Sequence, residues 1–367
     1  MTSNLTSNPV PVTIGQGPPQ HRPIPEPDPR RGGGLVDSFG RVHRDLRISL
    51  TDRCSLRCTY CMPEQGMEWL ARSSILSVPE IIRVAGICAE AGISTFRLTG
   101  GEPLLRRDIV QIVSELAGLR TPDGEPVQVA MTTNGIGLDK VIDALAEAGL
   151  ARLNISLDTV QPERFAELTR RNRFKDVMAG IEAASRSSLR PLKLNAVAMR
   201  GVNDDELVDL VEFAISMQAQ MRFIEQMPLD AGHTWDRNQM VTREEILEAL
   251  SKRWKLHPLP GRGGAPAEKF GLDGTDQQVG VIASVTAPFC GACDRLRLTA
   301  DGQLRNCLFS TDEYDLVPVL RSEDPALNTD AHIDAVLRAC IDAKKPGHGI
   351  NDPGFLQPAR GMNAIGG

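Results

Sequence analysis

Six of the eight cysteines form two groups of three, and these groups are the residues most suited to chemistry. The first group is Cys54, Cys58 and Cys61, and the second is Cys290, Cys293 and Cys307. A structural zinc site is normally closed by four ligands, and neither a histidine nor a fourth cysteine lies close in sequence to the first group. An iron–sulfur cluster held by three thiolates instead leaves one iron free for another ligand. The first group therefore indicates such a cluster.

The second group again offers three thiolates, and Arg295 and Arg297 follow its second cysteine. Cys340 could complete a zinc site or a four-cysteine cluster with this group, so that alternative stays open from the sequence. Cys88 falls in a helical pattern, and we expect it to be a small core residue.

The 367 residues are 41% hydrophobic and 24% charged, which suffices for one large domain or two modest ones. No run reaches the roughly eighteen apolar residues that a membrane helix needs, and the N-terminus lacks the apolar segment of a signal peptide. We therefore expect a soluble, cytoplasmic protein with reduced cysteines. The net charge of −6 argues against general nucleic-acid binding, so an anionic ligand would have to meet a local basic patch.

From residue 45 onward, short apolar segments alternate with amphipathic ones. The predicted strands span 46–50, 95–99, 127–132, 152–156, 192–198 and 221–225. The predicted helices span 78–91, 106–118, 138–148, 175–187 and 204–217. Ser77 and Glu80 predict a capping box at the first helix. This alternation predicts a parallel α/β sheet, and six strands favour a partial (β/α)6 barrel over an open doubly wound sheet.

Three regions follow from this pattern. Residues 1–34 hold eight of the 25 prolines and three consecutive glycines, which predicts a disordered tail. Residues 35–259 hold the partial barrel and a further helix at 242–253. Residues 260–367 form a smaller C-terminal α+β region that closes the barrel and carries the second cysteine group. Its predicted elements are a loop at 260–267, strands at 278–285, 295–299 and 303–308, and a helix at 331–343.

The motifs follow predicted strands, where parallel sheets place groups that contact ligands. The first cysteine group follows the strand at 46–50, and the segment Gly100, Gly101, Glu102, Pro103 follows the next strand. Two glycines allow a ligand to approach the backbone, and a glutamate can accept from a cation. The spacing Cys-x3-Cys-x2-Cys with Tyr60 before the last cysteine, followed by Gly-Gly-Glu-Pro, resembles the radical S-adenosylmethionine (SAM) superfamily.

That resemblance implies a cluster whose open iron is chelated by SAM, which is cleaved to a 5′-deoxyadenosyl radical. Within the superfamily, the chain from about residue 40 to its end resembles the MoaA family of GTP 3′,8-cyclases, which act in molybdenum cofactor biosynthesis. The matching segments are 47–63 (RISLTDRCSLRCTYCMP), 96–103 (FRLTGGEP), 132–135 (TTNG), 154–158 (NISLD), 222–227 (RFIEQM), the second cysteine group and the Gly-Gly end.

The resemblance also implies roles for individual residues. The two cysteine groups would hold two [4Fe–4S] clusters, and the second cluster would bind the guanine base. The residues implied to bind SAM are Tyr60, Gly101, Glu102, Ser156 and Met227. The residues implied to bind GTP are Arg47, Arg97, Thr132, Lys193, Arg295 and Arg297. Gly366 and Gly367 match a double-glycine tail that the family needs for activity.

The implied enzyme is a lyase that converts GTP to 3′,8-cyclo-7,8-dihydro-GTP. The radical would take hydrogen from C3′ of GTP, the C3′ radical would attack C8 of the guanine, and reduction would then give the product. The resemblance further implies a homodimer, an external electron donor and hand-over to the synthase that makes cyclic pyranopterin monophosphate. Neither a nucleic acid nor a membrane is expected as a partner.

Two positions depart from the family pattern. Many members carry lysine where Thr95 stands, and Asp294 occupies a position that is commonly asparagine. We expect these changes to weaken phosphate attraction without removing the chemistry. Two other functions stay open from the sequence: a radical SAM maturase with another substrate, and a non-catalytic, zinc-stabilised α/β interaction protein. Zinc without iron after anaerobic purification would favour the last.

Overall fold

The computed structural model describes residues 16–230 and 235–366. Within these residues, a 13-stranded sheet has the order β2-β14-β13-β12-β3-β4-β5-β6-β7-β8-β11-β10-β9. Its centre consists of six parallel strands in chain order. They are β3 (Asp45–Ser49), β4 (Thr95–Thr99), β5 (Gln128–Thr133), β6 (Leu150–Ser156), β7 (Leu192–Ala198) and β8 (Gln220–Glu225). The predicted strands are confirmed, each within two residues.

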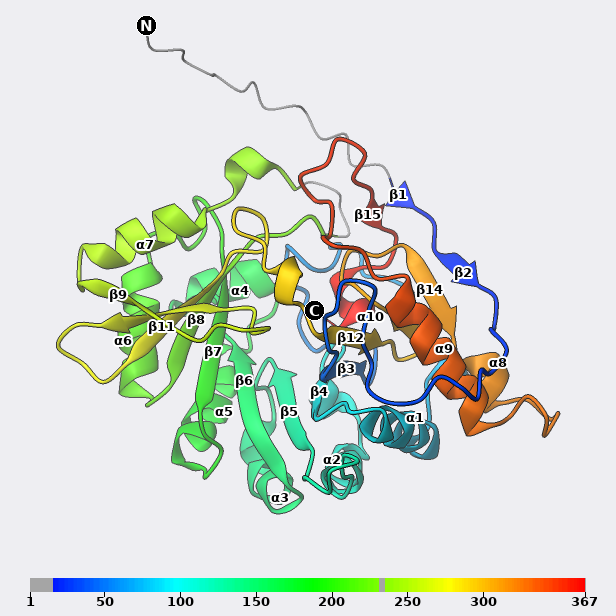
Figure 1. Cartoon of the computed structure of the whole chain (residues 1–367). Coiled ribbons are helices and arrows are strands. Elements are labelled where there is room, and N and C mark those ends of the chain that lie inside the picture. The colour runs from blue at the N-terminus through cyan, green and yellow to red at the C-terminus, as the bar shows by residue number, and fades with distance from the viewer. Residues whose placement is uncertain (1–15, 231–234, 367) are drawn as a thin grey trace, which may run out of the picture.

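Helices follow the central strands and cover the outer face of the curved sheet (Figure 1). They are α1 (Val78–Glu90), α2 (Ile109–Ala117), α3 (Ile142–Glu147), α4 (Pro162–Thr169), α5 (Phe174–Arg186), α6 (Leu207–Ser216) and α7 (Arg243–Ser251). The Ser77–Glu80 capping box is confirmed, with Ser77 N donating to Glu80 Oε2 at 2.7 Å. The helix predicted over 138–148 is instead divided into the 3₁₀ turn η3 (Leu138–Lys140) and α3.

Residues alternate along the central strands between two environments. On β3, the side chains of Leu46 and Ile48 are fully buried under the outer helices, whereas Arg47 is on the opposite, inner face. Cys88 on α1 is fully buried, which confirms the expected core position. In the described part of the chain, no helix combines the length and the apolar character needed to cross a membrane.

The C-terminal region lengthens the sheet at both of its edges and does not close it. β12 (Arg295–Leu298) pairs in parallel with β3, and β11 (Gln278–Ile282) pairs in parallel with β8. The other strands of these edges are β9 (Leu256–Leu259), β10 (Glu268–Leu272), β13 (Gln303–Arg305) and β14 (Asp312–Asp315). β9 and β10 pair across the predicted boundary at residue 259. The remaining helices are α8 (Val317–Leu320), α9 (Asp330–Asp342) and α10 (Met362–Ile365).

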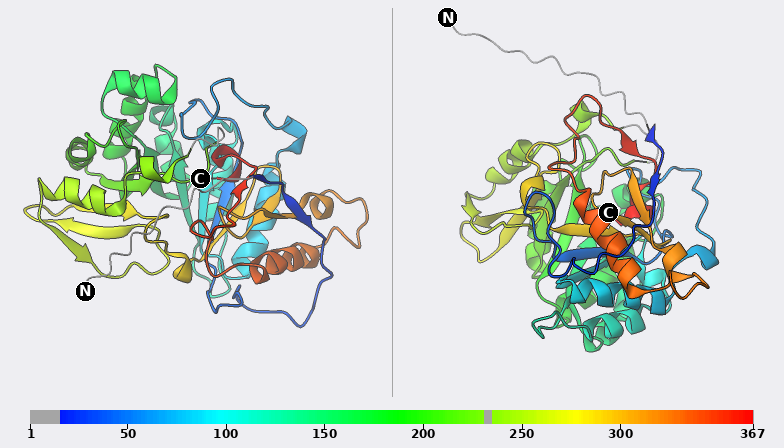
Figure 2. Two further views of the ribbon diagram at one scale, coloured as in Figure 1. Left: turned by 90° about the horizontal axis from the view of Figure 1, so that it is seen from above. Right: turned by 45° about the vertical axis from the view of Figure 1, so that its right-hand side comes forward.

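The disordered tail predicted over 1–34 is wrong for residues 16–34, and residues 1–15 lie outside the described part. β1 (Gln16–Gly17) pairs with β15 (Gln357–Pro358), and β2 (Gln20–Arg22) pairs with β14 (Figure 2). Arg22 bonds Asp312 at 2.8 Å and Arg31 bonds Asp342 at 2.6 Å. Proline is compatible with an extended segment at the edge of a sheet, so a proline-rich composition alone did not reveal this contact.

Candidate active site

Two adjoining cavities lie inside the curved sheet. The smaller, of about 130 Å³, lies at the carboxyl ends of the central strands and is lined by all three cysteines of the first group. The larger, of about 470 Å³, extends along the inner face of the strands and is lined by all three cysteines of the second group. Thr132 near the end of β5 lines both cavities, so molecules bound in the two would meet beside this residue.

The loop of the first cysteine group packs directly on the Gly-Gly-Glu-Pro segment after β4. Gly101 N donates to Thr51 O at 2.7 Å, and Glu102 N donates to Arg53 O at 2.7 Å. A Cβ atom at Gly101 would overlap the backbone of this loop, and Gly100 has a φ of +130° and equally little space. The two glycines are therefore required by the contact between the loops, in addition to any contact with a ligand.

Glu102 has a structural role that the sequence did not indicate. Thr133 Oγ1 and Leu104 N donate to Oε1 at 2.6 and 2.9 Å, and Asn134 N donates to Oε2 at 2.7 Å. Burial nevertheless raises the pKa of Glu102 to about 7. Glu102 lines the smaller cavity, but these contacts also make it a tie between the ends of β4 and β5.

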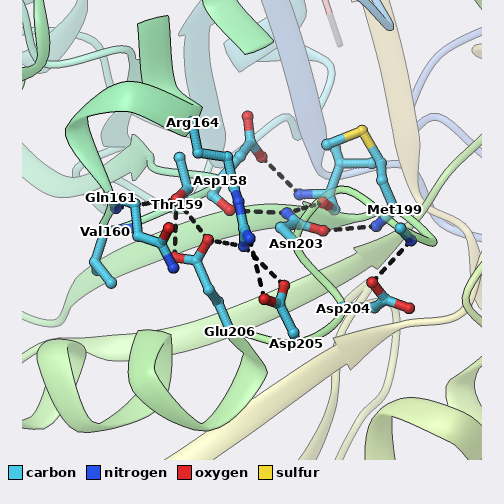
Figure 3. A network of polar contacts seen from close by, with 12 residues as sticks. Asp158, Thr159, Val160, Gln161, Arg164, Met199, Asn203, Asp204, Asp205 and Glu206 are labelled. Atoms are coloured by element: carbon cyan, nitrogen blue, oxygen red, sulfur yellow. Dashed lines mark hydrogen bonds and ion pairs between the residues drawn. The ribbon is translucent and has the colours of Figure 1, made fainter. Parts of the chain in front are cut away.

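Tyr60, the aromatic residue of the cysteine motif, lines the smaller cavity, and its side chain is held in place by hydrogen bonds. Its hydroxyl donates to Asp158 Oδ2 at 2.8 Å, and a backbone N–H of β7 donates to Asp158 Oδ1 at 2.8 Å. Burial raises the pKa of Asp158 to about 6. Asn203 Nδ2 donates to the Asp158 carbonyl at 2.7 Å, and neighbouring contacts tie this segment to Glu206 and Arg164 (Figure 3). These hydrogen bonds within the protein fix the orientation of the Tyr60 side chain without a ligand.

The first cysteine group suits a cofactor that binds thiolates. Burial raises the pKa of Cys54 to about 11 and that of Cys61 to about 12, so binding iron would displace protons from these thiols. Asn134 Nδ2 donates to Cys54 Sγ at 3.7 Å. Nowhere in residues 16–230 and 235–366 do three His, Cys, Asp or Glu side chains converge closely enough to hold one metal ion. Ligands of a cluster bind separate irons and lie further apart.

The second cysteine group lies at the turn η5 (Cys290–Ala292), just before β12 and after β13. Arg41 Nη1 donates to Cys290 O at 2.8 Å. Burial disfavours the thiolate of Cys293, but the positive charges of Arg295 and Lys344 lower its pKa to about 7. Cys340 is fully buried on α9, and its thiol is not among the described groups that line the larger cavity.

The larger cavity has a strongly cationic wall. The predicted GTP-binding residues Arg47, Arg97, Thr132, Lys193, Arg295 and Arg297 all line it. Sequence reasoning missed the further cations Arg44, Arg152, Arg222 and Lys269. The alternation of β6 could have identified Arg152, because it lies on the same face of the strand as Asn154 and Ser156. Asp45 and Asp294 are the carboxylates among the described residues of this wall.

Four of these arginines form one row across the sheet. In the register of the strands, Arg297 of β12 is opposite Arg47 of β3, which is opposite Arg97 of β4. Ala130 of β5 continues the row to Arg152 of β6. Like charges directly opposite each other destabilise a sheet. A bound anion would therefore stabilise the sheet most at this row, because it would offset the repulsion between the arginines.

The pKa values of these groups report the same excess of positive charge. Burial, followed by the charges of nearby arginines, lowers the pKa of Lys193 to about 7. Burial lowers the pKa of Arg222 to about 9 and that of Arg297 to about 10. The Nε atoms of Arg47 and Arg152 are buried without a hydrogen-bond partner among the described residues. The wall lacks sufficient anions of its own.

The two departures from the family pattern both lie on this wall. Thr95 and Asp294 line the larger cavity. Burial raises the pKa of Asp294. Burial lowers the pKa of Arg97, and the nearby charge of Arg152 lowers it further. Arg152 of β6 thus supplies a cation to the row, whereas Thr95 supplies none.

The predicted SAM-binding residues are only partly brought together. Tyr60, Gly101, Glu102 and Ser156 line the smaller cavity. Met227 lines the larger cavity and is not among the described residues around the smaller one.

The C-terminal tail runs between the two cavities. Gly366 is buried with a φ of +69°, and its carbonyl accepts a hydrogen bond from Arg297. On α10, Asn363 Nδ2 donates to Asp52 O at 3.0 Å, and its backbone N–H bonds the Cys61 thiol, which partly offsets the rise in pKa that burial causes there. Gly367, predicted together with Gly366, lies outside the described residues. The tail thus contacts both the first cysteine loop and the cationic wall.

Comparisons with known proteins agree with this arrangement. Residues 48–214 match the radical SAM superfamily, and residues 219–350 match the family described as Molybdenum Cofactor Synthesis C. The chain also resembles the solved structure of SuiB from Streptococcus suis, with a TM-score of 0.56 at 14% identity over 85% of this chain and 68% of that one. At this identity the likeness concerns the fold alone.

Curated relatives extend over nearly the whole chain. A GTP 3′,8-cyclase of Streptomyces coelicolor is 52% identical over 91% of this chain and 96% of its own length. A GTP 3′,8-cyclase of Corynebacterium glutamicum is 53% identical over 91% of this chain and 89% of its own length. GTP 3′,8-cyclase 2 of Mycobacterium tuberculosis is 48% identical over 91% of this chain and 92% of its own length. The chain belongs to the radical SAM superfamily and, within it, to the family of the GTP 3′,8-cyclases.

Proposed function

We propose that this protein is a GTP 3′,8-cyclase, a lyase that forms 3′,8-cyclo-7,8-dihydro-GTP at the start of molybdenum cofactor biosynthesis. The observation that carries the proposal is the pair of adjoining cavities: a thiol-lined one for SAM and its cluster, and a cationic one that ends at a second thiol group. Neighbouring cavities suit a reaction in which an atom of one bound molecule must approach an atom of another.

In the smaller cavity, Cys54, Cys58 and Cys61 would hold a [4Fe–4S] cluster whose open iron binds SAM. Tyr60, oriented by Asp158, and the backbone at Gly101 would contact SAM, with Ser156 at the end of β6 facing the same space. Glu102 would act mainly by keeping the ends of β4 and β5 together, since three protein groups already donate to it. Met227 would reach SAM only from the side of the larger cavity.

In the larger cavity, the arginine row would bind the triphosphate. A triphosphate supplies the negative charge that this wall lacks, and arginine forks match phosphate oxygens. Lys193 and Arg222 extend the cationic surface, while Arg295 lies over the Phe289 ring at 4.7 Å beside the second cysteine group. The second cluster, held by Cys290, Cys293 and Cys307, would anchor the guanine at that end.

The chemistry divides between cofactor and protein. SAM and its cluster, held by the first cysteine group, would supply a 5′-deoxyadenosyl radical to take hydrogen from C3′ of GTP. Bonding of C3′ to C8 would leave a radical that one electron from the external donor and one proton convert to the 7,8-dihydro product. The chain fixes the triphosphate at one end of GTP and the base at the other, so that the ribose lies beside Thr132, where the cavities meet. The tail at Gly366, held by Arg297, would cover this junction and limit water.

The remaining expectations complete the proposal and rest on family membership. The protein would work in the cytoplasm as a homodimer, receive electrons from an external donor and pass its product to the synthase of cyclic pyranopterin monophosphate. A radical SAM maturase acting on another substrate, such as a peptide, is the second candidate. The cationic wall favours the nucleotide, because a peptide needs no row of arginines.

The test is anaerobic incubation of the iron-reconstituted protein with SAM and dithionite, with and without GTP. We expect 5′-deoxyadenosine and a cyclised nucleotide, both dependent on GTP and identified by mass spectrometry. Deoxyadenosine without a GTP product would favour a maturase. Absence of deoxyadenosine from a sample shown to contain its iron would contradict radical SAM activity.

A further inference from the structure

Lys344, just beyond the end of α9, is a buried cation that the reaction described above does not use. Its residue is 5% exposed. Its ammonium donates to Arg295 O at 2.8 Å and to Asn306 O at 2.5 Å. Both acceptors are neutral backbone carbonyls, so these bonds satisfy donors without balancing the charge.

The described surroundings of Lys344 contain no carboxylate bonded to it. Asp37, a buried acid of the N-terminal segment, is already bonded to Arg41 at 2.6 Å and to His43 at 3.1 Å. Burial and the charge of Lys344 lower the pKa of His43 to about 4, so His43 is neutral at pH 7. Asp294 faces the larger cavity beside Arg295, and its carboxylate interacts with the charge of Lys344 without a hydrogen bond to the ammonium. A buried ammonium without a bonded counter-charge is costly.

The two carbonyls that Lys344 bonds belong to the segments that carry the second cysteine group. Arg295 lies two residues after Cys293, and Asn306 directly precedes Cys307. The ammonium therefore joins the first residue of β12 to the residue that follows β13. Because Asn306 directly precedes Cys307, the ammonium lies one peptide unit from a proposed cluster ligand.

We propose that Lys344 is a positioning residue of the second cluster: it joins two of the ligand-bearing segments and supplies a buried counter-charge to the cluster. This inference rests on the ligand assignment in the proposed function. Reduction adds one negative charge to a cluster, and a nearby cation stabilises that form. Lys344 therefore raises the midpoint potential of the second cluster and favours its assembly.

The test uses the full chain with Cys54, Cys58 and Cys61 all replaced by serine, so that any cluster belongs to the second group. Lys344→Met removes the charge and both hydrogen bonds, and Lys344→Gln keeps a donor without the charge. Lys345→Met is the matched control, because Lys345 is the exposed neighbour. Iron per chain and the midpoint potential, followed by electron paramagnetic resonance, are measured after anaerobic reconstitution, with circular dichroism to verify folding.

We expect Lys344→Met to bind less iron than the parent, and its remaining cluster to have a more negative midpoint potential. A change on the order of tenfold in the reduced-to-oxidised ratio would be a shift of about 59 mV for one electron. Lys344→Gln should recover iron content but keep the more negative potential, and Lys345→Met should match the parent. If Lys344→Met folds but does not bind iron, the potential is read from Lys344→Gln.

An unchanged midpoint potential in both Lys344 variants would contradict the role of Lys344 as a counter-charge. Unchanged iron content in Lys344→Met would contradict its role in joining the two segments. If the parent with three serines binds no cluster, the ligand assignment fails and the inference fails with it. If the wild-type protein makes no product from GTP while the Lys344 shifts are found, the proposed function fails and the inference stands.

Discussion

Arg297 holds Gly366 by donating a hydrogen bond to its carbonyl, at a point where the cationic wall meets the C-terminal tail. The same guanidinium donates to Ile365 O at 3.3 Å and lines the larger cavity. Arg297 thus contacts the tail and faces the cavity proposed to bind GTP. If Arg297 binds the triphosphate as proposed, triphosphate binding and the position of the tail are coupled through this one side chain.

A side chain at Gly366 should displace the tail. In Gly366→Ala, the new Cβ would lie 2.5 Å from Thr99 Oγ1 and 2.6 Å from Ser49 Oγ, at a φ of +69°. Because small displacements at a reaction centre cost about 10²-fold in rate, product formation should fall by about that factor. Gly261→Ala is the control, since Gly261 has a φ of +85° but open space around it. Equal turnover of the two variants would show that the tail position does not matter.

The affinity for GTP should fall as pH rises above about 7. Lys193 has a pKa of about 7 in the free protein because of burial and neighbouring arginines, and a bound triphosphate would favour its charged form. Binding at pH 8 should therefore take up a proton, whereas the phosphate itself, with a second pKa of about 6, is already ionised. Calorimetry in two buffers of different ionisation enthalpy measures this uptake. The same uptake by Lys193→Met would contradict the assignment.

Loss of Arg295 should separate SAM cleavage from product formation. Arg295→Ala leaves the first cysteine group intact but removes a cation from the end of the larger cavity. The KM for GTP should rise about tenfold to hundredfold, since a charge-assisted hydrogen bond contributes about 1.5–3 kcal/mol. Arg253→Ala is the control, because that side chain is 58% exposed on the outer surface. A wild-type KM in Arg295→Ala would remove this residue from the GTP site.

Loss of one cysteine of the first group should abolish SAM cleavage. Cys58→Ser should keep about half of the iron, because the second cluster remains, and should form no 5′-deoxyadenosine. Cys88→Ser is the control for a buried cysteine outside both groups and should keep its iron. Continued deoxyadenosine formation by Cys58→Ser would be incompatible with its role as a cluster ligand.

The central sheet was predictable because local patterns determine it. The apolar runs at 95–99 and 192–198 coincide with β4 and β7, and the helices that cover them show clear amphipathic periods. α4 was missed because it is short and largely polar. The pairing of β2 with β14 joins residues almost 300 positions apart, and no local signal in a proline-rich segment reveals a contact of that kind.

The site was predictable where a motif fixes the residue type, and less so where the register of the sheet creates the function. Both cysteine groups and five of the cations were identified from the sequence. Arg152 joins the arginine row only through the register of β4, β5 and β6. Likewise, the meeting of Arg297 with Gly366 and the burial of Lys344 depend on packing between distant segments.

SAM and GTP are proposed to occupy adjoining cavities that meet at Thr132. The isotopic content of 5′-deoxyadenosine formed from GTP deuterated at C3′ tests this arrangement. Each deoxyadenosine should gain one deuterium, together with a cyclised nucleotide that has lost it. Unlabelled deoxyadenosine formed alongside product would show that hydrogen is taken from another atom, and would contradict the proposed arrangement of the two ligands.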